Sequence, residues 1–352
     1  MSAPLAIASV GFTALGFALC LVFCALVKRS GIVDEPDGGR KQQTTAIPRL
    51  GGVAIAAGAL LGSLVSFFIL LLAWGTSPGA GLSRLFAEIS NLLQGYETVL
   101  VFVAGAFLLG LWDDVWTANT KLKLIALAGL CIGVAAFGLI PDALTSPWGD
   151  VTLPVVLIIG SAAWLLVFTN AVNFIDGSDG LAVGSLTIML IGLATSGTLV
   201  GAWSFSVLWF SLFGALVGFL MHNLRGALYV GDAGALGLGA LFSGLALISG
   251  LDIWTVATLA LPFLVDVLVT LIWRAKHGRN WLEPHLDHAY QRLIASGWSH
   301  LDVAILYWGF SAVSGAAAYI AAKGGGAAPF AVFWGLCLAG IALWIRHRRA
   351  AE

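Results

Sequence analysis

The chain reads Leu153-Pro-Val-Val-Leu-Ile-Ile-Gly-Ser-Ala-Ala-Trp-Leu-Leu-Val-Phe-Thr169 and continues Asn170-Ala-Val-Asn173-Phe-Ile-Asp176-Gly-Ser-Asp179-Gly-Leu181, with a second apolar run over 181–200. Three-residue spacing places Asn170, Asn173 and, on a continued helix, Asp176 on one helical face. Two glycines then favour a loop. A solvated turn between two helices is the alternative interpretation. Because polar groups beside a membrane span are costly, the ladder of amides and carboxylates is a candidate functional site.

Composition indicates a polytopic membrane protein. Of the 352 residues, 59% are hydrophobic and 10% are charged, and the mean hydropathy is +0.97. Soluble proteins carry about 25% charged residues. The net charge of −1 gives no indication of nucleic-acid binding, and none is expected. The four cysteines lie in apolar runs without the spacing of a metal site or a disulfide framework.

Apolar stretches long enough to cross a bilayer, about 20 residues in a helix, occur throughout the chain. We predict an all-α polytopic membrane protein with about eleven transmembrane helices, built as a single membrane domain over residues 1–352. The expected spans are 4–27, 51–74, 96–112, 122–140, 153–170, 181–200, 203–221, 233–250, 253–273, 302–322 and 328–345.

The placement of basic residues predicts the orientation of these spans. With eleven spans, the C-terminus and half of the connections share one side, and that side receives fifteen of the 17 Lys and Arg residues. Only Arg84 and Lys323 fall on the opposite side. The positive-inside rule makes the basic side cytoplasmic. The first apolar stretch is followed, not preceded, by basic residues, so we expect a retained span with the N-terminus outside and the C-terminus inside.

Nearly every distinctive polar motif falls in the inner loops, and we expect these loops to form one site on the cytoplasmic face. The loops are 28–50, 113–121, 170–180, 222–232 and 274–301. Besides the opening stretch, their motifs are Pro48-Arg49-Leu50-Gly51-Gly52, Asp113-Asp114, Tyr229-Val-Gly231-Asp232-Ala-Gly234 and His285-Leu-Asp-His288-Ala-Tyr-Gln-Arg292.

The residue types in these loops suit a divalent cation and phosphate groups. Hard oxygen ligands dominate and soft ligands are absent, which favours Mg²⁺, with Mn²⁺ as the alternative, over zinc. A carboxylate-held metal beside a cationic rim is typical of phosphoryl transfer. The carboxylates are Asp113, Asp114, Asp176, Asp179 and Asp232, and the cations are Arg40, Lys41, Arg49, Lys121, Lys123 and Arg292.

In their order along the chain, these motifs resemble those of the polyprenyl-phosphate N-acetylhexosamine-1-phosphate transferases. That family includes the phospho-MurNAc-pentapeptide translocase of peptidoglycan synthesis. The matches lie between residues 34 and 300, and the run from Asn170 to Leu181 is the most specific. The resemblance implies a Mg²⁺-dependent enzyme that transfers a sugar-1-phosphate from a UDP-sugar to undecaprenyl phosphate and releases UMP.

The resemblance also implies roles for individual residues. Asp113 and Asp114 match a catalytic pair, one of which acts as a base on the lipid phosphate or positions it. Lys123 matches the lysine of that motif, with Lys121 as the alternative. Asn173 and Asp232 match metal ligands. The substrate-binding residues implied in the same way are Arg40, Lys41, Asn170, Asp176, Asp179, Tyr229, His285, His288 and Arg292.

The sequence departs from the family pattern in three places. Gln43 stands where a histidine is usual, Leu127 stands where a glutamine is usual, and the fifth loop lacks an adjacent His-His pair. This loop, with Gly297-Trp-Ser-His300, resembles the branch that initiates O-antigen and exopolysaccharide synthesis. The branch implies a UDP-N-acetylhexosamine donor or its 6-deoxy derivative, and the bacterial inner membrane as the location. A homodimer is among the assemblies that it allows.

Two other functions fit part of the pattern. The peptidoglycan translocase would share every catalytic motif and would differ in its donor, UDP-MurNAc-pentapeptide. An ion-coupled carrier would also place acids and amides beside glycine breaks, but near the membrane midplane. Here most acids lie at span ends and no internal repeat is evident. Asp266 is an exception inside a span, and both a packing role and a functional role are open for it.

Overall fold

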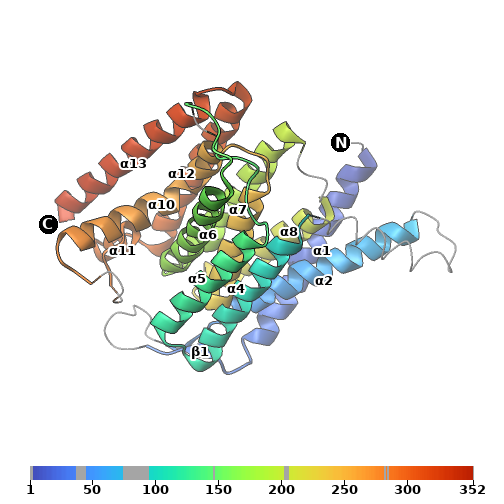
Figure 1. The fold of residues 1–352 in the computed structure, drawn as a ribbon. Helices are drawn as coiled ribbons and strands as arrows, with labels where there is room; N and C mark the ends of the chain where they lie inside the picture. Colours follow the sequence, from blue (N-terminus) through green and yellow to red (C-terminus); the bar gives the residue numbers. More distant parts are fainter. Residues whose placement is uncertain are drawn as a thin grey trace.

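The computed structural model describes residues 3–36, 45–73, 95–145, 147–201, 206–280, 283 and 285–351, which fold almost entirely into helices (Figure 1). A helix lies at each of the eleven expected spans. These helices are α1 (Ala3–Val27), α2 (Gly51–Ala73), α4 (Glu97–Trp116), α5 (Thr120–Ala136), α6 (Pro154–Ile175), α7 (Leu181–Gly197), α8 (Ser206–Asn223), α9 (Gly231–Leu247), α10 (Ile253–Lys276), α12 (His300–Gly324) and α13 (Ala328–Ala351).

Eight of these helices are long and apolar enough to cross a membrane. The other three, α5, α8 and α9, have 17, 18 and 17 residues. Large apolar side chains such as Leu108 and Ile132 remain exposed on the outward faces of the helices, where a bilayer would cover them. The all-α polytopic membrane fold is therefore confirmed.

Capping residues define where several helices begin. Asn119 accepts the amides of the first turn of α5, at 3.0 and 3.3 Å. Asp252 accepts two amides at the start of α10, both at 3.0 Å. Ser299 accepts from Asp302 N at 3.1 Å at the start of α12. These side chains replace the partners that the first amides of a helix lack.

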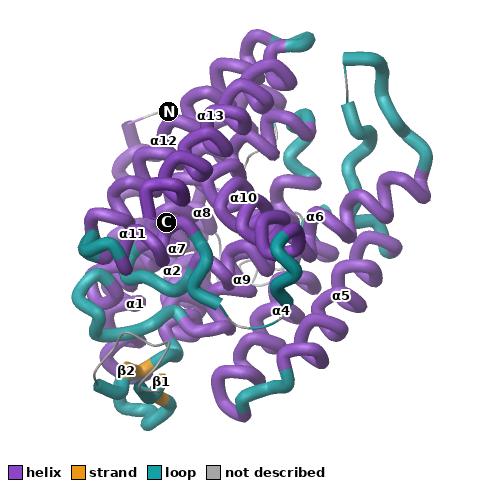
Figure 2. The backbone as a smooth tube through the Cα atoms, turned by 90° about the vertical axis from the view of Figure 1, so that its left-hand side faces the viewer, coloured by secondary structure: helices purple, strands orange, loops and turns teal. Residues whose placement is uncertain are grey.

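The described part of the chain adds short elements that the hydropathy pattern did not predict. Strands β1 (Val33–Asp34) and β2 (Ile47–Pro48) pair antiparallel within the first inner loop, at one end of the helices (Figure 2). Helix α11 (Ala289–Ala295) lies within the fifth inner loop. A 3₁₀ turn, Thr198–Val200, follows α7. The first and fifth inner loops thus carry defined local structure.

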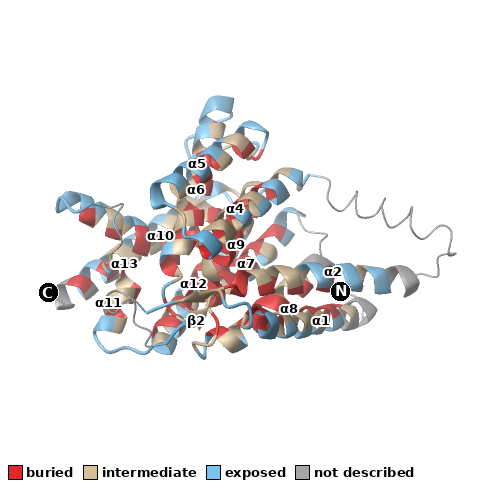
Figure 3. Cartoon of the chain, turned by 90° about the horizontal axis from the view of Figure 1, so that it is seen from below, coloured by how far each residue is buried: buried red, intermediate tan, exposed pale blue. Residues whose placement is uncertain are grey.

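Helix α9 forms the centre of the fold. It packs against α4, α6, α2 and α7, and 13 of its 17 residues are buried. Figure 3 shows the buried residues concentrated on α7 and α9. Glycine and alanine occupy most positions of α9, and small residues allow neighbouring backbones to approach closely. The residues at the N-terminus of α9 are therefore held in place by several neighbouring helices.

Several of the predicted loop boundaries differ from the observed helix ends by a few residues, because the helices extend further than the apolar runs. Helix α4 continues to Trp116 and includes Asp113 and Asp114. Helix α6 continues to Ile175, so that Asn170 and Asn173 are helical. The fourth loop ends at 230, where α9 begins. The polar motifs are thus carried on rigid helix ends.

Candidate active site

The Asp113-Asp114 pair lies in the last turn of α4, and its two carboxylates have different surroundings. The chain leaves the helix through Thr117, which has a left-handed φ of 52°. The amide of Ala118 donates to Asp113 Oδ1 at 2.6 Å. The Asp113 side chain remains 17% exposed, whereas Asp114 is buried. Only the first carboxylate is open to a ligand.

Asp114 caps the N-terminus of α9. Asp232 N donates to Asp114 Oδ1 at 3.0 Å, and Ala233 N donates to Asp114 Oδ2 at 2.9 Å. Arg49 Nε lies 3.9 Å from Asp114 Oδ1, and Arg49 Nη2 donates to the Asp114 carbonyl. A carboxylate is favourable at a helix N-terminus because of the free amides and the helix dipole. Two amides and a guanidinium thus offset part of the cost of burying this carboxylate.

Lys123, from α5, brings two carboxylates together. Its Nζ donates to Asp113 Oδ2 at 2.6 Å and also pairs with Asp232 Oδ2. Asn173 Nδ2, from α6, donates to Asp232 Oδ1 at 3.0 Å. The Lys123 and Asp232 side chains are 17% and 28% exposed. We name Asp113, Lys123, Asn173 and Asp232 the charged cluster, which four different helices supply and which a ligand can reach.

Glycines allow the helices to approach closely enough to build the charged cluster. A Cβ at Gly52 would lie 2.2 Å from Gly234 N, and a Cβ at Gly110 would lie 2.3 Å from the Asp232 carbonyl oxygen. Gly231 has a φ of 73°, which L side chains rarely adopt. Substitution at any of these glycines would displace α9 and, with it, Asp232.

Tyr229 connects the first and fourth inner loops. Its amide donates to the Pro48 carbonyl at 2.8 Å, and its carbonyl accepts from Gly51 N at 2.9 Å. Burial, followed by the charge of nearby carboxylates such as Asp179, raises the pKa of Tyr229 to about 12. The phenol therefore stays neutral at physiological pH, beside the carboxylates of the neighbouring loop.

Side chains from two other helices fix the loop of residues 176–180, between α6 and α7. Gly180 N donates to Asn223 Oδ1 at 2.7 Å, and Trp308 Nε1 donates to the Gly180 carbonyl at 3.0 Å. The buried amide of Asn223 also donates to the Leu228 carbonyl at 3.0 Å. Asn223 therefore holds this loop and the segment before Tyr229 together.

Asp176 and Asp179 are half-buried carboxylates on this loop. Burial, and then the charge of Asp232, raises the pKa of Asp176 well above its usual value. Burial also raises the pKa of Asp179, while the nearby His300 opposes that rise. His300 Nδ1 lies 3.0 Å from Ser178 Oγ. Both carboxyls therefore hold a proton more readily than usual.

Three arginines surround Asp287 in the fifth inner loop. Arg274 Nη1 donates to Asp287 Oδ2, Arg279 Nη1 lies 3.3 Å from Oδ1, and Arg348 Nη2 lies 3.5 Å from Oδ1. The Arg348 guanidinium also lies over the ring of Trp273, 3.2 Å from its centre. Burial opposes ionisation, but Arg274 and the other cations hold the pKa of Asp287 below its usual value. Helix α13 is thereby attached to this loop.

The predicted substrate-binding residues of the fifth loop lie on and before α11. His288 is buried at the N-cap of α11, and its ring centre lies 4.8 Å from that of His285. Burial lowers the pKa of His285 to about 4, so its ring is neutral at pH 7. Within the described residues, the half-buried Arg292 guanidinium has no hydrogen bond or ion pair. It is therefore available to an anion.

The structure shows a packing role for Asp266. Its buried carboxylate accepts from Ala289 N at 2.7 Å and from Tyr307 OH at 2.6 Å. His288 Nδ1 lies 3.5 Å from Asp266 Oδ1. Asp266 therefore joins α10, the start of α11 and α12.

Not all predicted residues join the charged cluster. Lys121, the alternative to Lys123, is exposed and its side chain contacts no described residue through an ion pair or hydrogen bond. Asn170 Nδ2 donates to the Leu166 carbonyl of its own helix at 2.8 Å. Three residues of the first inner loop, Arg40, Lys41 and Gln43, lie outside the described residues.

Several residues that hold the site in place were not among the residues predicted for it. Asn223, His300 and Trp308 fix the 176–180 loop, and Arg348 fixes the fifth loop. Asn223 could have been found as an amide at the inner end of a predicted span. His300 belongs to the Gly297-Trp-Ser-His300 motif, which could have indicated it, whereas Arg348 gave no distinguishing signal, because basic residues at span ends usually mark topology.

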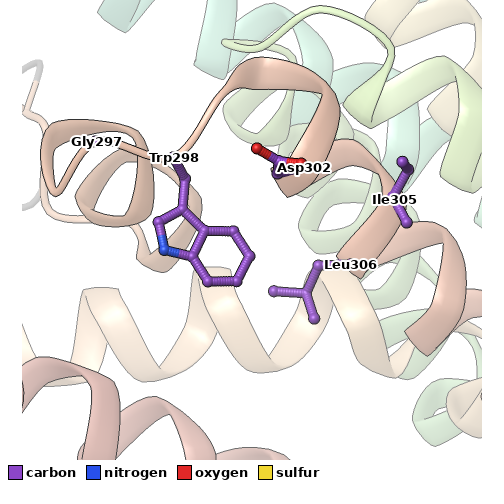
Figure 4. A pocket seen from close by; sticks show the side chains of 5 residues that line it. All are labelled: Gly297, Trp298, Asp302, Ile305 and Leu306. Carbon is purple, nitrogen blue, oxygen red and sulfur yellow. The ribbon is translucent and has the colours of Figure 1, made fainter.

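An open pocket of about 540 Å³ lies at the start of α12 (Figure 4). Trp298, Asp302, Ile305 and Leu306 line it, together with Gly297. Figure 4 shows the Trp298 indole and the Leu306 side chain facing the same space. None of the charged-cluster residues lines this pocket, although Gly297 and Trp298 belong to the fifth inner loop.

The charged cluster fits a magnesium ion better than a metal that requires a full protein cage. No group of three or more His, Cys, Asp or Glu residues that could hold a metal occurs in the described residues. Mg²⁺ needs only one or two protein carboxylates, because water and substrate phosphates complete its coordination. Asp232 supplies carboxylate oxygens at the part-exposed centre of the cluster, and Asn173, whose Nδ2 donates to Asp232 Oδ1, still has an amide oxygen that can accept a cation. The donor set therefore suits Mg²⁺.

The fold defines a multi-pass membrane protein, and sequence comparisons place it in a family. The profile of glycosyl transferase family 4 matches residues 96–250. A phospho-N-acetylmuramoyl-pentapeptide-transferase of Synechococcus sp. (strain RCC307) is 30% identical over 344 residues, which cover 88% of this chain and 86% of the relative. The chain therefore belongs to glycosyl transferase family 4, and the resemblance of its motifs is confirmed.

Two further relatives carry different substrate names. A probable undecaprenyl-phosphate N-acetylglucosaminyl 1-phosphate transferase of Bacillus subtilis (strain 168) is 28% identical, covering 82% of this chain and 78% of the relative. A decaprenyl-phosphate N-acetylglucosaminephosphotransferase of Mycobacterium leprae (strain TN) is 29% identical, covering 76% of this chain and 72% of the relative. The matches thus include transferases named for N-acetylglucosamine and for N-acetylmuramoyl-pentapeptide.

Proposed function

We propose that the protein transfers an N-acetylhexosamine-1-phosphate, or its 6-deoxy derivative, from a UDP-sugar to undecaprenyl phosphate and releases UMP. The charged cluster is the observation that carries this proposal. It combines carboxylates, an amide and a lysine at helix ends, which suits the binding of phosphate groups and their cation. The names of the relatives support a polyprenyl-phosphate acceptor.

In the reaction, a phosphate oxygen of the lipid attacks the β-phosphorus of the UDP-sugar. A new P–O bond joins the lipid phosphate to the sugar phosphate, and the bond between the two nucleotide phosphates breaks, so that UMP leaves with the electron pair. We assign Asp113 to the lipid phosphate, as a base or a positioning group, because it is part-exposed. Buried Asp114 holds α9, and Lys123 stabilises phosphate charge.

Asp232 and Asn173 are the proposed ligands of Mg²⁺, with Mn²⁺ as the alternative. When bound, the ion supplies positive charge to the pyrophosphate. The chain's own contribution is to hold the ligands in place: Asn173 orients the Asp232 carboxylate, and the Asp114 cap fixes the turn on which Asp232 lies. Lys123 neutralises the same carboxylate before substrate arrives.

The donor pocket is proposed to lie between the 176–180 loop and the fifth inner loop. Asn170, Asp176 and Asp179 face the nucleotide sugar, and Tyr229 lies against the uracil. His285, His288 and Arg292 read the sugar and its phosphate, and Arg40 and Lys41 add charge from the first loop. The half-buried carboxyls of Asp176 and Asp179 support this, because such groups can form hydrogen bonds with uracil or sugar hydroxyls.

The site is proposed to face the cytoplasm of a bacterial inner membrane, with the N-terminus outside and the C-terminus inside. The basic bias of the inner connections supports this orientation. The product would begin a lipid-linked cell-surface glycan such as an O-antigen. A homodimer stays a prediction, which cross-linking in membranes would check.

Release of UMP by purified protein tests the proposal. The assay contains Mg²⁺, undecaprenyl phosphate and a panel of UDP-sugars that includes UDP-MurNAc-pentapeptide. We expect lipid-dependent release with one N-acetylhexosamine donor. Release with the pentapeptide donor alone would assign the protein to peptidoglycan synthesis, which the Synechococcus relative makes the second candidate. No release by folded protein would overturn the proposal and favour the carrier.

A further inference from the structure

Helix α11 depends on contacts with other helices for its position. It has only seven residues, and isolated helices of that length are unstable in water. Its first two amides, Ala289 N and Tyr290 N, donate to the Asp266 carboxylate at 2.7 and 3.4 Å. Tyr307 OH donates to the same group at 2.6 Å. The buried carboxylate of α10 thus determines where α11 begins.

Tyr290 connects α11 to the 176–180 loop. Its side chain is almost completely buried, and its hydroxyl donates to the Phe174 carbonyl at 3.0 Å, in the last turn of α6. A Cβ at Gly177 would lie 2.2 Å from Tyr290 OH, so the loop backbone passes directly against the hydroxyl. The fifth inner loop and the 176–180 loop are therefore in direct contact at this hydroxyl.

We propose that Asp266 and Tyr290 are a positioning pair that fixes the fifth inner loop against the 176–180 loop, so that both segments engage the nucleotide sugar in one arrangement. Asp266 sets the start of α11, and the Tyr290 hydroxyl sets its distance from the loop that carries Asp176 and Asp179. Arg292, two residues after Tyr290, is then held with its guanidinium free for an anion. The inference rests on the proposed function, in which these segments form the donor pocket.

Tyr290→Phe isolates the contact between the two loops. It keeps the buried ring and removes only the hydroxyl that reaches Phe174. We expect the KM for the UDP-sugar to rise about 5-fold, the usual effect of one lost hydrogen bond, with an unchanged KM for undecaprenyl phosphate. Hydrogen exchange of the 174–180 amides should accelerate. Tyr319→Phe, on α12, is the matched control and should change neither quantity, because the Tyr319 hydroxyl has no partner among the described residues.

Asp266→Asn tests the cap of α11. Asparagine can still accept from Ala289 N through its Oδ1, but its amide nitrogen cannot accept from Tyr307 OH. We expect a rise of about 10-fold in the donor KM and faster exchange of the α11 amides. Asp252→Asn is the control, since Asp252 caps the start of the same helix α10 and lies apart from α11.

Exchange and kinetics separate a failure of this inference from a failure of the proposed function. If wild-type protein releases no UMP, the exchange measurement still tests the contact between the loops. If Tyr290→Phe leaves exchange at 174–180 unchanged, the positioning pair is wrong, whatever the enzyme does. If exchange accelerates while both KM values and kcat stay unchanged, the contact is structural only and the inference is overturned. A rise in the lipid KM equal to that of the donor would overturn it as well.

Discussion

Asp114 and Asp266 are buried carboxylates that each cap the start of a helix, but their surroundings differ. Asp114 caps α9 and Asp266 caps α11, each by accepting the first amides of the helix. Around Asp114 the neighbours are charged: the Arg49 guanidinium lies 3.9 Å from its Oδ1, and Asp232, which pairs with Lys123, is on the turn that it caps. Around Asp266, tyrosine and histidine side chains complete a closed network. Helix α9 is long and central, whereas α11 has only seven residues.

The difference indicates how the molecule divides positioning from chemistry. The charged cluster at the start of α9 holds opposite charges that remain part-exposed. Such an arrangement is costly near a membrane unless the charges bind a ligand. At the start of α11, the charge of Asp266 is completely buried among hydrogen-bond donors. The Arg292 guanidinium lies outside this network. Substitutions around Asp114 and the charged cluster should therefore affect turnover, and substitutions around Asp266 and α11 should affect binding of the UDP-sugar and the choice between donors.

The largest effect is expected for Asp232→Asn. The change keeps the shape of the side chain and removes the charge that pairs with Lys123 and would hold the cation. We expect turnover to fall by about 10³-fold or more, as when a key electrostatic group is removed. UMP release measured across a Mg²⁺ titration checks this. Activity near that of wild type would remove Asp232 from the metal site, and an unchanged melting temperature is the control for folding.

Lys123→Met should have the next largest effect. Methionine keeps much of the apolar length but leaves Asp113 and Asp232 facing each other without a cation, so we expect a loss of about 100-fold in kcat. Lys121→Met is the matched control, because Lys121 is two residues away on the same helix and exposed. We expect it to stay within about 2-fold of wild type. A larger loss in Lys121→Met than in Lys123→Met would reverse the assignment.

The helices could be predicted from the sequence because their length is set by the bilayer. Each of the eleven expected spans has a helix, and the errors lie at the ends, where α4 and α6 extend past the apolar run. Polar residues such as Asp113 and Asn173 ended the predicted spans. In the folded chain their side chains have partners from other helices, so the helix can continue through them.

The contacts within the site could not be predicted in the same way. Lys123 and Asp232 are 109 residues apart, and Tyr290 OH and the Phe174 carbonyl are 116 residues apart. Hydropathy and spacing describe neighbours along one helix, and they contain no information on which helix ends meet. The motifs indicated which residues matter, but only the fold shows that Asp114 caps α9 whereas Asp113 stays exposed.

Asp114→Asn is expected to have an intermediate effect. One oxygen of the carboxylate becomes an amide nitrogen, so that Asp232 N or Ala233 N loses its acceptor. Since an unsatisfied buried amide costs about 1–3 kcal/mol, α9 should shift and kcat should fall about 10-fold. Thermal unfolding in detergent measures the stability and UMP release measures the rate. A loss of rate as large as that of Asp232→Asn, at unchanged stability, would show that Asp114 acts in the reaction itself.

In the fifth inner loop we expect a change in donor preference and not a loss of turnover, for His285→Ala compared with His277→Ala. His285 lies beside His288 in the proposed donor pocket, whereas His277 is exposed and stacks on Trp273. We expect His285→Ala to change the preference between UDP-sugars by about 10-fold and His277→Ala to change it little. Equal effects would place the fifth-loop histidine outside the donor pocket.

The acid dependence of stability gives an independent test of the same histidine. Burial lowers the pKa of His285 from 6.5 to about 4, so between these values the unfolded chain binds more protons than the folded chain. Its contribution to stability is therefore complete above pH 6.5 and is lost as the pH falls toward 4. Because the ring is half-exposed, the contribution should be roughly 1 kcal/mol. Melting temperatures at pH 5 and pH 7 should thus differ less in His285→Ala than in wild type. If the two melting temperatures differ as much in His285→Ala as in wild type, the His285 ring is solvated. The contact that we assign between the neutral ring and the sugar would then be wrong.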